Sequence, residues 1–357
     1  MDLTTIKRRE FLKSMGLISA GTYATGLGAF SLSSCDSTPA FNKREAVLNL
    51  LTSTGKQGYI PSGFFVHFGE GYQWGDAAVA RHLEYFKAID MDFIKIQYEA
   101  LFPAIDIIQK PEDWAKMPYY KKDFYEKQLY VVKELVKQGK KMAPVIATFY
   151  SPFMCAGHSV TSQLVTEHLK QDPESVKKGL EIITDSVMIF LKECKKLGVD
   201  GFLAPTQGNE AFRFQDPKIF LDYIKPTDMV VQNEINDGCI CNVLHICDYE
   251  GPYDDVSPFV DYPGHIVNLS DVIAGERVPL KELYTMFGER PIMGGLEKRG
   301  PILTGTDQAI QAQVNKVLEE APDRFILGAE CALLGEVDWK KVRTAVDTGH
   351  AFSKHQN

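Results

Sequence analysis

The chain has 357 residues, of which 45% are apolar and 24% are charged, values typical of soluble globular proteins. This composition excludes a disordered chain, a collagen-like repeat and a multi-span membrane protein. The formal net charge is −8, and because residues 1–34 hold four basic and two acidic side chains, the rest of the chain carries −10. We therefore expect no nucleic-acid partner, since so acidic a body repels phosphate backbones.

The first 34 residues predict a targeting signal that is not part of the fold. The pair Arg8-Arg9, followed by residues 11–13 and a weakly apolar run over 15–32, resembles the bacterial twin-arginine signal, which implies a cofactor inserted before export. The four residues that end at Cys35 resemble a lipoprotein cleavage box, which implies that Cys35 is lipidated and becomes the mature N-terminus. We expect a periplasmic or membrane-anchored lipoprotein with the bacterial membrane as a partner. The alternative is an N-terminal helix with a chance arginine pair.

Residues 35–60 are expected to form a tether and a short leading helix that contains Leu48, Leu50 and Leu51. From residue 61 to 357, short runs rich in Val, Ile and Phe alternate with longer segments of helical period. The runs predict strands at 64–68, 93–98, 142–149, 201–205, 240–247, 265–269, 291–296 and 324–330. The segments between them predict helices at 76–89, 122–137, 173–196, 280–287, 307–320 and 339–348.

This alternation predicts an α/β protein, and about eight βα units over roughly 300 residues favour a TIM (β/α)8 barrel from 61 to 357. A doubly wound sheet is the alternative, but no Gly-x-Gly-x-x-Gly motif follows any predicted strand. In a barrel, functional side chains lie at the carboxyl ends of the strands and in the loops that follow. The predicted strand ends are more polar and richer in sulfur than the strand interiors, so we look for the active site there.

His245 and Cys247 stand two residues apart at the end of the fifth predicted strand, so both are expected to project into the barrel mouth. Imidazole nitrogen and thiolate sulfur are preferred zinc ligands, and a catalytic zinc has three protein ligands and one open position. Cys331, at the end of the last strand, can supply the third ligand. By themselves, these residues equally allow a buried histidine beside two inert thiols. Cys239 and Cys241 are interpreted as packing residues, because four residues along a strand span roughly 13 Å.

Residues 59–351 resemble the uroporphyrinogen decarboxylase superfamily, which implies a TIM barrel. The resemblance is carried by the stretches 197–201, 243–247, 265–269, 292–296 and 324–331. The decarboxylases of this superfamily have an Arg-rich segment near the first strand, an Asp after the second and a His after Gly in a late strand. Here residues 61–69 contain no Arg, residues 94–100 contain no Asp, and Glu330-Cys331 occupies the late position.

The other branch of the superfamily contains the methylcobamide:coenzyme M and related corrinoid methyltransferases, which bind zinc through His-x-Cys and a later Cys. His245, Cys247 and Cys331 match this pattern residue by residue. The resemblance implies a zinc-dependent methyltransferase-like enzyme that activates a small-molecule thiol for methyl transfer from a corrinoid, either as substrate or borne by a partner protein. One alternative is a decarboxylase-like lyase acting on a carboxylated tetrapyrrole, which would need basic residues such as Arg213 or Arg299. Another is a non-catalytic exported lipoprotein that binds a tetrapyrrole or another small molecule.

Further polar side chains at the predicted strand ends are candidates for catalysis. His67 and Tyr98 end the first two strands and could hydrogen-bond a substrate, although packing at the barrel mouth explains them equally well. Glu330 is a candidate catalytic residue and, like Glu99, a candidate fourth zinc ligand. Asp248 is expected to orient His245 as a hydrogen-bond acceptor.

Aromatic and amide side chains near the strand ends are candidates for cofactor binding. Tyr72 and Trp74 lie in the loop after the first strand, where a flat tetrapyrrole could stack, and Asn268 ends the sixth strand. A surface anchor is the alternative for the aromatic pair. The remaining histidines on helices and in the tail are expected to be solvated, namely His82, His168, His350 and His355.

Overall fold

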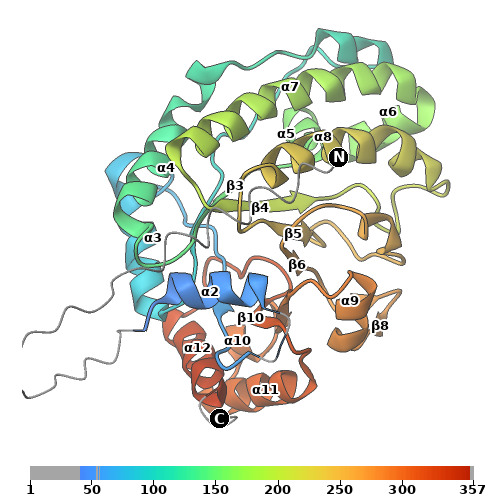
Figure 1. The fold of residues 1–357 in the computed structure, drawn as a ribbon. Helices are drawn as coiled ribbons and strands as arrows, with labels where there is room; N and C mark the ends of the chain where they lie inside the picture. Colours follow the sequence, from blue (N-terminus) through green and yellow to red (C-terminus); the bar gives the residue numbers. More distant parts are fainter. Residues whose placement is uncertain (1–40, 54, 56, 354–357) are drawn as a thin grey trace, which may run out of the picture. The chain divides into compact units, whose positions relative to one another are not determined.

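The computed structural model describes residues 41–53, 55 and 57–353 (Figure 1). The expected export signal over 1–34, the lipidation site Cys35 and the tail residue His355 lie outside the described residues. From Asn42 onward the chain forms one unit. Within the described ranges, no helix has both the length and the apolar character needed to cross a bilayer.

In the described chain, eight parallel strands form one curled sheet in the spatial order β1-β10-β9-β6-β5-β4-β3-β2, with helices around it (Figure 1). β1 and β2 stand at the two ends of this order, and the Asp92 backbone N–H donates to the Ser62 carbonyl oxygen at 2.8 Å, which joins them. The predictions of an α/β protein and a TIM barrel are confirmed. The strands are β1 (Ser62–Gly63), β2 (Ile94–Ile96), β3 (Val145–Thr148), β4 (Gly201–Thr206), β5 (Val243–Ile246), β6 (Ile266–Asn268), β9 (Ile292–Leu296) and β10 (Phe325–Ala329).

The helices around the sheet correspond to the predicted ones in six cases: α3, α4, α7, α9, α11 and α12. Sequence analysis missed α6 and three helices that begin near Pro152, Pro226 and Pro301, because proline reads as a helix breaker yet fits the first helical turn. The bounds are α3 (Gly75–Ile89), α4 (Glu126–Gly139), α5 (Pro152–Ser159), α6 (Ser162–Gln171), α7 (Pro173–Leu197), α8 (Lys225–Asn236), α9 (Leu280–Met286), α10 (Pro301–Thr304), α11 (Asp307–Glu320) and α12 (Trp339–Ser353).

Smaller elements complete the described part of the fold. The first strand was predicted at 64–68, but the structure places β1 two residues earlier, and Val66 makes only a single bridge to Leu333. A two-stranded hairpin that was not predicted follows β6. The short elements are β7 (Val272–Ile273), β8 (Glu276–Arg277), η1 (Pro111–Lys116), η2 (Lys122–Tyr125), η3 (Phe220–Ile224) and η4 (Ser257–Phe259).

The longest helix, α7, shows why some boundaries could be predicted. The Asp172 side chain accepts a hydrogen bond from the Ser175 backbone N–H at 3.2 Å, and Pro173 occupies the first turn. The helix ends at Gly198, which has φ 88°, a left-handed conformation that favours glycine. These capping signals are local in sequence, so no tertiary contact is needed to recognise them.

The leading helix predicted within 35–60 is present as α2 (Lys43–Thr52) and lies at the amino-terminal end of the strands. Val47 and Leu50 are buried and pack with the apolar side chains that fill the barrel interior. This interior layer contains Phe65, Phe93, Ile146, Leu203, Cys241, Val243, Ile266, Met293 and Ile326. α2 therefore covers the amino-terminal end of the barrel, and Cys241 is a packing residue as interpreted from its spacing.

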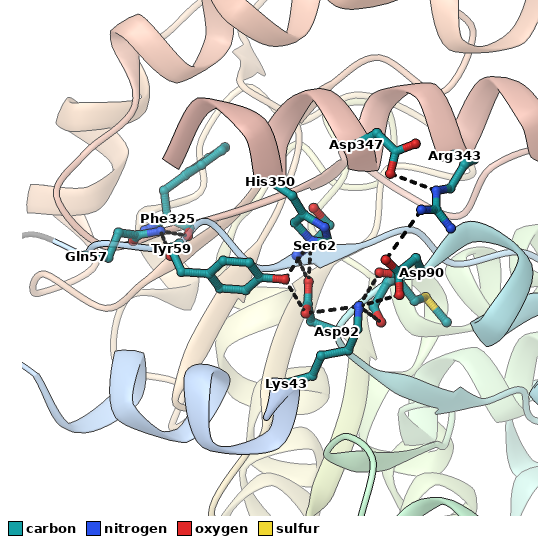
Figure 2. Close-up of polar contacts among 11 residues, drawn as sticks. Lys43, Gln57, Tyr59, Ser62, Asp90, Asp92, Phe325, Arg343, Asp347 and His350 are labelled. Atoms are coloured by element: carbon teal, nitrogen blue, oxygen red, sulfur yellow. Dashed lines mark hydrogen bonds and ion pairs between the residues drawn. The ribbon is translucent and has the colours of Figure 1, made fainter. Parts of the chain in front are cut away.

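Ion pairs fasten α2 to this end of the barrel (Figure 2). Lys43 Nζ lies 2.9 Å from Asp90 Oδ1 and 3.5 Å from Asp92 Oδ1. Asp92, which is fully buried, also accepts hydrogen bonds from the Tyr59 hydroxyl at 2.7 Å and from the Ser62 backbone N–H at 2.7 Å. On α12, His350 Nε2 lies 2.9 Å from Asp92 Oδ2. Helices from both ends of the chain thus meet at one buried carboxylate.

The expectation that the described helical histidines are solvated is wrong. His82 is buried, with Nδ1 2.7 Å from the Ala78 carbonyl oxygen, and its Nε2 accepts a hydrogen bond from the Gln97 backbone N–H. His168 is also buried and accepts a hydrogen bond from Trp114 Nε1 at 3.1 Å. Histidine is a frequent satisfied core residue, and a sequence pattern does not show which polar partner its ring will meet.

Candidate active site

His245, Cys247 and Cys331 meet at the carboxyl ends of the strands. His245 lies on β5, Cys247 follows the end of the same strand, and Cys331 follows the end of β10. Their ligand atoms all lie within 4.8 Å of one another, with His245 Nε2 3.5 Å from Cys331 Sγ. All three side chains are buried. The two sulfurs are thus well inside the 7 Å limit beyond which a shared metal ion is impossible, and the structure brings the predicted ligands together.

The protonation of these three groups is coupled through short contacts. The Cys247 thiol donates to Cys331 and lowers the pKa of Cys331, and the positive charges of His245 and Lys298 act in the same direction. Burial is the largest single influence and lowers the pKa of His245, but the charge of Cys331 and the hydrogen bond to it, together with the charge of Asp248 and a backbone hydrogen bond to Asn268, raise the pKa overall. These contacts therefore favour the thiolate form of Cys331. A cation that replaces the shared protons would meet one nitrogen and two sulfur donors, the donor set that zinc prefers.

Neighbouring polar groups fix the backbone that carries the ligands. The Tyr253 hydroxyl donates to the Cys247 carbonyl oxygen at 3.0 Å, and Gln207 Nε2 lies 3.6 Å from Cys247 Sγ. Asn268 Nδ2 donates to the carbonyl oxygens of Met293 at 2.8 Å and Ala329 at 3.0 Å, which links β6 to β9 and β10. These bonds hold the strand ends that carry His245 and Cys331 at a set separation.

A pocket of about 1160 Å³ opens at the carboxyl ends of the strands, with the three ligands in its wall. Of the predicted site residues outside the triad, His67, Asn268 and Glu330 line this pocket. Lys95 and burial together lower the pKa of His67 to about 4, so its imidazole is neutral at pH 7. Burial raises the pKa of Glu330, whose carboxylate accepts from the Lys298 backbone N–H at 3.2 Å. Asn268 is engaged between strands, as described above.

Tyr98, Tyr72 and Trp74 do not line the pocket, so we correct their predicted roles as contacts of a substrate or cofactor. Tyr98 is 2% exposed and packs between the rings of Tyr150 and Phe190. The prediction failed because Tyr98 follows β2 with the outward parity of a residue that faces the helices.

The aromatic pair lies in the loop between β1 and α3 and is partly exposed. The Arg81 guanidinium sits 4.8 Å from the centroid of the Tyr72 ring, and Lys127 Nζ sits 5.9 Å from the centroid of the Trp74 ring. Cations on these faces fit surface anchoring, the alternative weighed for this loop.

Two charged residues, Asp248 and Arg213, have partners that the sequence did not reveal. Asp248, expected to orient His245, pairs instead with Lys298 Nζ at 2.7 Å. Arg213, considered as a carboxylate-binding residue, is 1% exposed and pairs with Glu210 and with Glu250 at 2.6 Å.

Neither Glu99 nor Glu330, the candidate fourth zinc ligands, joins the group of mutually close ligand atoms in the described chain. Arg299 lines the pocket at its exposed rim.

Sequence reasoning missed Lys95 and Thr148, which line the pocket from β2 and β3. Lys95 interrupts the apolar run over 93–98, and its parity with Phe93 places it on the inner face of the barrel. A charged residue inside an otherwise buried strand was the signal that could have drawn attention to it.

Comparisons with known proteins agree with this architecture. A family model described as "Uroporphyrinogen decarboxylase (URO-D)" matches residues 87–352. A curated relative, the uroporphyrinogen decarboxylase of Aquifex aeolicus (strain VF5), is 21% identical over 232 residues, which cover 63% of this chain and 65% of that protein. The chain thus matches less than two thirds of the length of this relative.

Two solved structures share the fold at low identity. A methyltransferase from Methanosarcina mazei has a TM-score of 0.70 and 15% identity, covering 87% of this chain and 99% of that chain. A B12-independent methionine synthase from Shewanella sp. W3-18-1, in complex with selenomethionine, has a TM-score of 0.51 and 13% identity, covering 85% and 96%. At these identities the likeness concerns the fold.

Proposed function

Since the chain belongs to the uroporphyrinogen decarboxylase family, we propose that it is a zinc-dependent methyltransferase-like enzyme that activates a thiol for methyl transfer from a corrinoid donor. Membership in the family supports a methyl-transfer or a decarboxylase-like role. The observation that favours methyl transfer is the convergence of His245, Cys247 and Cys331, whose ligand atoms lie within 4.8 Å of one another in the pocket wall.

In this proposal the protein supplies three ligands and leaves the rest of the metal sphere to the substrate. Cys247 and Cys331 hold the ion through sulfur, and His245 through nitrogen. Bound zinc would supply positive charge that stabilises a substrate sulfur as its thiolate. Glu330 lies next to Cys331 in the chain and lines the same pocket, and its raised pKa makes its carboxylate a suitable acceptor for the proton that a thiol loses.

The decarboxylase-like alternative rests on the family itself and on the printed name of the Aquifex relative. It requires cations that hold several carboxylates. Arg213 is unsuited to that task because Glu210 and Glu250 already neutralise it. Incubation with a carboxylated tetrapyrrole and measurement of released carbon dioxide tests this alternative directly.

Metal content tests the proposal. We expect about one zinc ion per purified chain, and at least roughly tenfold less in Cys331→Ser. Cys239→Ser is the matched control, because Cys239 is as buried as Cys331 but is no part of the ligand group. With methylcobalamin and a small thiol, methyl transfer should fall at least about 100-fold in Cys331→Ser and stay unchanged in Cys239→Ser. A wild-type protein without zinc, or a Cys331→Ser variant that keeps it, contradicts the proposal.

We also propose that the protein is exported and held at the bacterial membrane through lipidated Cys35, as the sequence of the first 35 residues predicts. Replacement of Arg8 and Arg9 by lysine should leave unprocessed precursor in the cytoplasm. Cys35→Ser should prevent lipid attachment without changing zinc content. Normal processing of the double-lysine variant contradicts the twin-arginine interpretation.

A further inference from the structure

Lys95 is a buried cation without a partner. Its side chain projects from β2 to the inside of the barrel, the residue is 6% exposed, and it lines the pocket. In the described part of the chain, Lys95 makes neither an ion pair nor a side-chain hydrogen bond; its closest aromatic neighbour is the Phe65 ring, 6.0 Å from Nζ. In folded proteins, highly buried Lys and Arg side chains are almost always paired, because an unpaired buried charge strongly destabilises a fold.

The carboxylate nearest in sequence, Glu99, attracts the Lys95 ammonium but forms no ion pair with it. Glu99 Oε1 accepts a hydrogen bond from Gln97 Nε2 at 2.6 Å and makes no ion pair with Lys95. Cys331 also attracts the ammonium group, but its sulfur belongs to the ligand group and contacts His245. The structure thus leaves a positive charge facing the pocket.

A second unsatisfied polar group lies on the neighbouring strand. Lys95 pairs in register with Ile146 of β3, so Thr148, two residues further on, faces the same side one step nearer the pocket mouth. Thr148 is 3% exposed and lines the pocket, yet its Oγ1 has no hydrogen-bond partner among the described residues. His67, in the segment that follows β1, lines the same pocket.

We propose that Lys95, Thr148 and His67 form an anion-binding subsite for a carboxylate group of a small molecule. One ammonium, one hydroxyl and one imidazole offer a single positive charge and several hydrogen-bond donors, which fits a singly charged carboxylate better than a doubly charged phosphate. The candidate metal ligands lie on or directly after β5 and β10, whereas Lys95 and Thr148 lie on β2 and β3 and His67 lies in the segment after β1. The subsite therefore binds its ligand with or without a metal.

Without a ligand, the protein is destabilised at this subsite because Lys95 lacks an ion-pair partner. Burial is the main cause that lowers the pKa of Lys95, to about 8, which agrees with a charge that lacks compensation. A bound carboxylate supplies that compensation, so its binding should stabilise the wild-type protein. Buried unsatisfied groups that line a pocket are retained when a ligand satisfies them.

Propionate is the probe, and propionamide is its neutral counterpart of the same shape. Isothermal titration of the full chain should show propionate binding, at least about tenfold weaker binding in Lys95→Met and about threefold weaker binding in Thr148→Val. Lys133→Met, a change at an exposed lysine of α4, should bind propionate as wild type does. Cys331→Ser should also retain binding, which separates this inference from the proposed zinc chemistry.

Thermal unfolding distinguishes a ligand-binding lysine from a structural one. Free Lys95→Met should melt at a higher temperature than the free wild type, and propionate should raise the melting temperature of wild type only. The inference is overturned if Lys95→Met binds propionate within twofold of wild type, if it melts below wild type, or if propionamide binds as tightly as propionate. Trapping of propionaldehyde on Lys95 by cyanoborohydride would also overturn it, because the lysine would then serve carbonyl compounds.

Discussion

Two buried charges at opposite ends of the barrel differ in their surroundings, because Asp92 at the amino-terminal end has partners and Lys95 in the pocket at the carboxyl end has none in the described chain. There Asp92 is fully buried and meets Lys43, Tyr59, His350 and the backbone of Ser62 (Figure 2). At the carboxyl end Lys95 is nearly as buried and meets no counter-ion in the described chain. The protein's own groups thus offset the cost of removing the Asp92 charge from water. No ion pair in the described chain offsets the similar cost for Lys95.

This difference distinguishes residues that stabilise the fold from residues that are available for binding. A buried charge with several partners holds elements together, and its loss leaves those partners unsatisfied. An unpartnered polar group that lines a pocket lowers the stability of the free protein and is available to a ligand or metal. We therefore expect substitutions at the amino-terminal end to change stability, and substitutions at the carboxyl end to change binding.

The largest expected effect on stability is at Asp92. Asp92→Ala should lower the free energy of unfolding by about 3–5 kcal/mol, because Lys43 and His350 lose their buried partner. Urea denaturation measures this change, and zinc content of the folded protein should stay at the wild-type level. Asp261→Ala, which removes an exposed pair with Lys225, is the control and should lose less than about 1 kcal/mol. A loss of less than about 1 kcal/mol for Asp92→Ala would contradict the stabilising role assigned to the buried charge at the amino-terminal end.

The apolar contact of α2 with the barrel should have a slightly smaller effect. Leu50→Ala removes a buried side chain from the interior layer and should reduce the free energy of unfolding by about 2–4 kcal/mol. Leu48→Ala, at a half-buried position of the same helix, should reduce it by less than about 1.5 kcal/mol. Equal losses in the two variants would mean that α2 does not insert its buried face into the barrel.

The free energy of unfolding is expected to depend on pH because of Asp228 of α8. This carboxylate is buried and accepts hydrogen bonds from Thr206 and Tyr262, and burial raises its pKa to about 7. The folded state therefore holds this proton more tightly than the unfolded state, so the stabilisation is complete below pH ~4 and is lost as pH rises to ~7.

The expected slope is at most about 1.4 kcal/mol per pH unit over that window. Asp228→Asn should remove it, so the difference in free energy of unfolding between wild type and variant should shift in favour of the variant as pH rises from ~5 to ~7. A difference that is constant with pH would show that Asp228 is ionised throughout.

The smallest expected effect is at Trp74. Because this ring is partly exposed and lies outside the pocket, Trp74→Ala should change the free energy of unfolding by less than about 0.5 kcal/mol. Zinc content and propionate affinity should match the wild-type values. Weaker propionate binding in this variant would show that the loop after β1 contributes to the binding site.

Much of the fold could be predicted because its signals are local. Seven of the eight strands of the sheet coincide with a short apolar run, β1 being the exception, and α7 begins and ends at recognisable caps. The candidate metal ligands were also predictable, since His245 and Cys247 have the same parity at a strand end and Cys331 follows the end of another strand. In a parallel barrel all strand ends of one kind meet at the same face, so position along a strand already implies proximity.

Roles that depend on a partner could not be predicted in this way. Arg213 had the chemistry of a carboxylate-binding residue, but the fold surrounds it with two glutamates. Tyr98 stood at a strand end like the true pocket residues, but the packing of α7 behind β2 buries it. The sequence alone shows which side chains can bind, whereas it does not show which of them the fold has already paired.

The sequence by itself determined where the strands and most long helices lie, and it determined the three candidate metal ligands, because periodicity, caps and strand parity act over a few residues. Only the tertiary structure decided that α2 covers one end of the barrel, that Lys95 lines the pocket without a counter-ion in the described chain, and that Thr148 Oγ1 lines it without a hydrogen-bond partner there. The physical reason is that burial and pairing are properties of neighbours from different strands. Closing the sheet brings β1 beside β2 and β10, and this closure supplies a partner to Asp92 and none to Lys95.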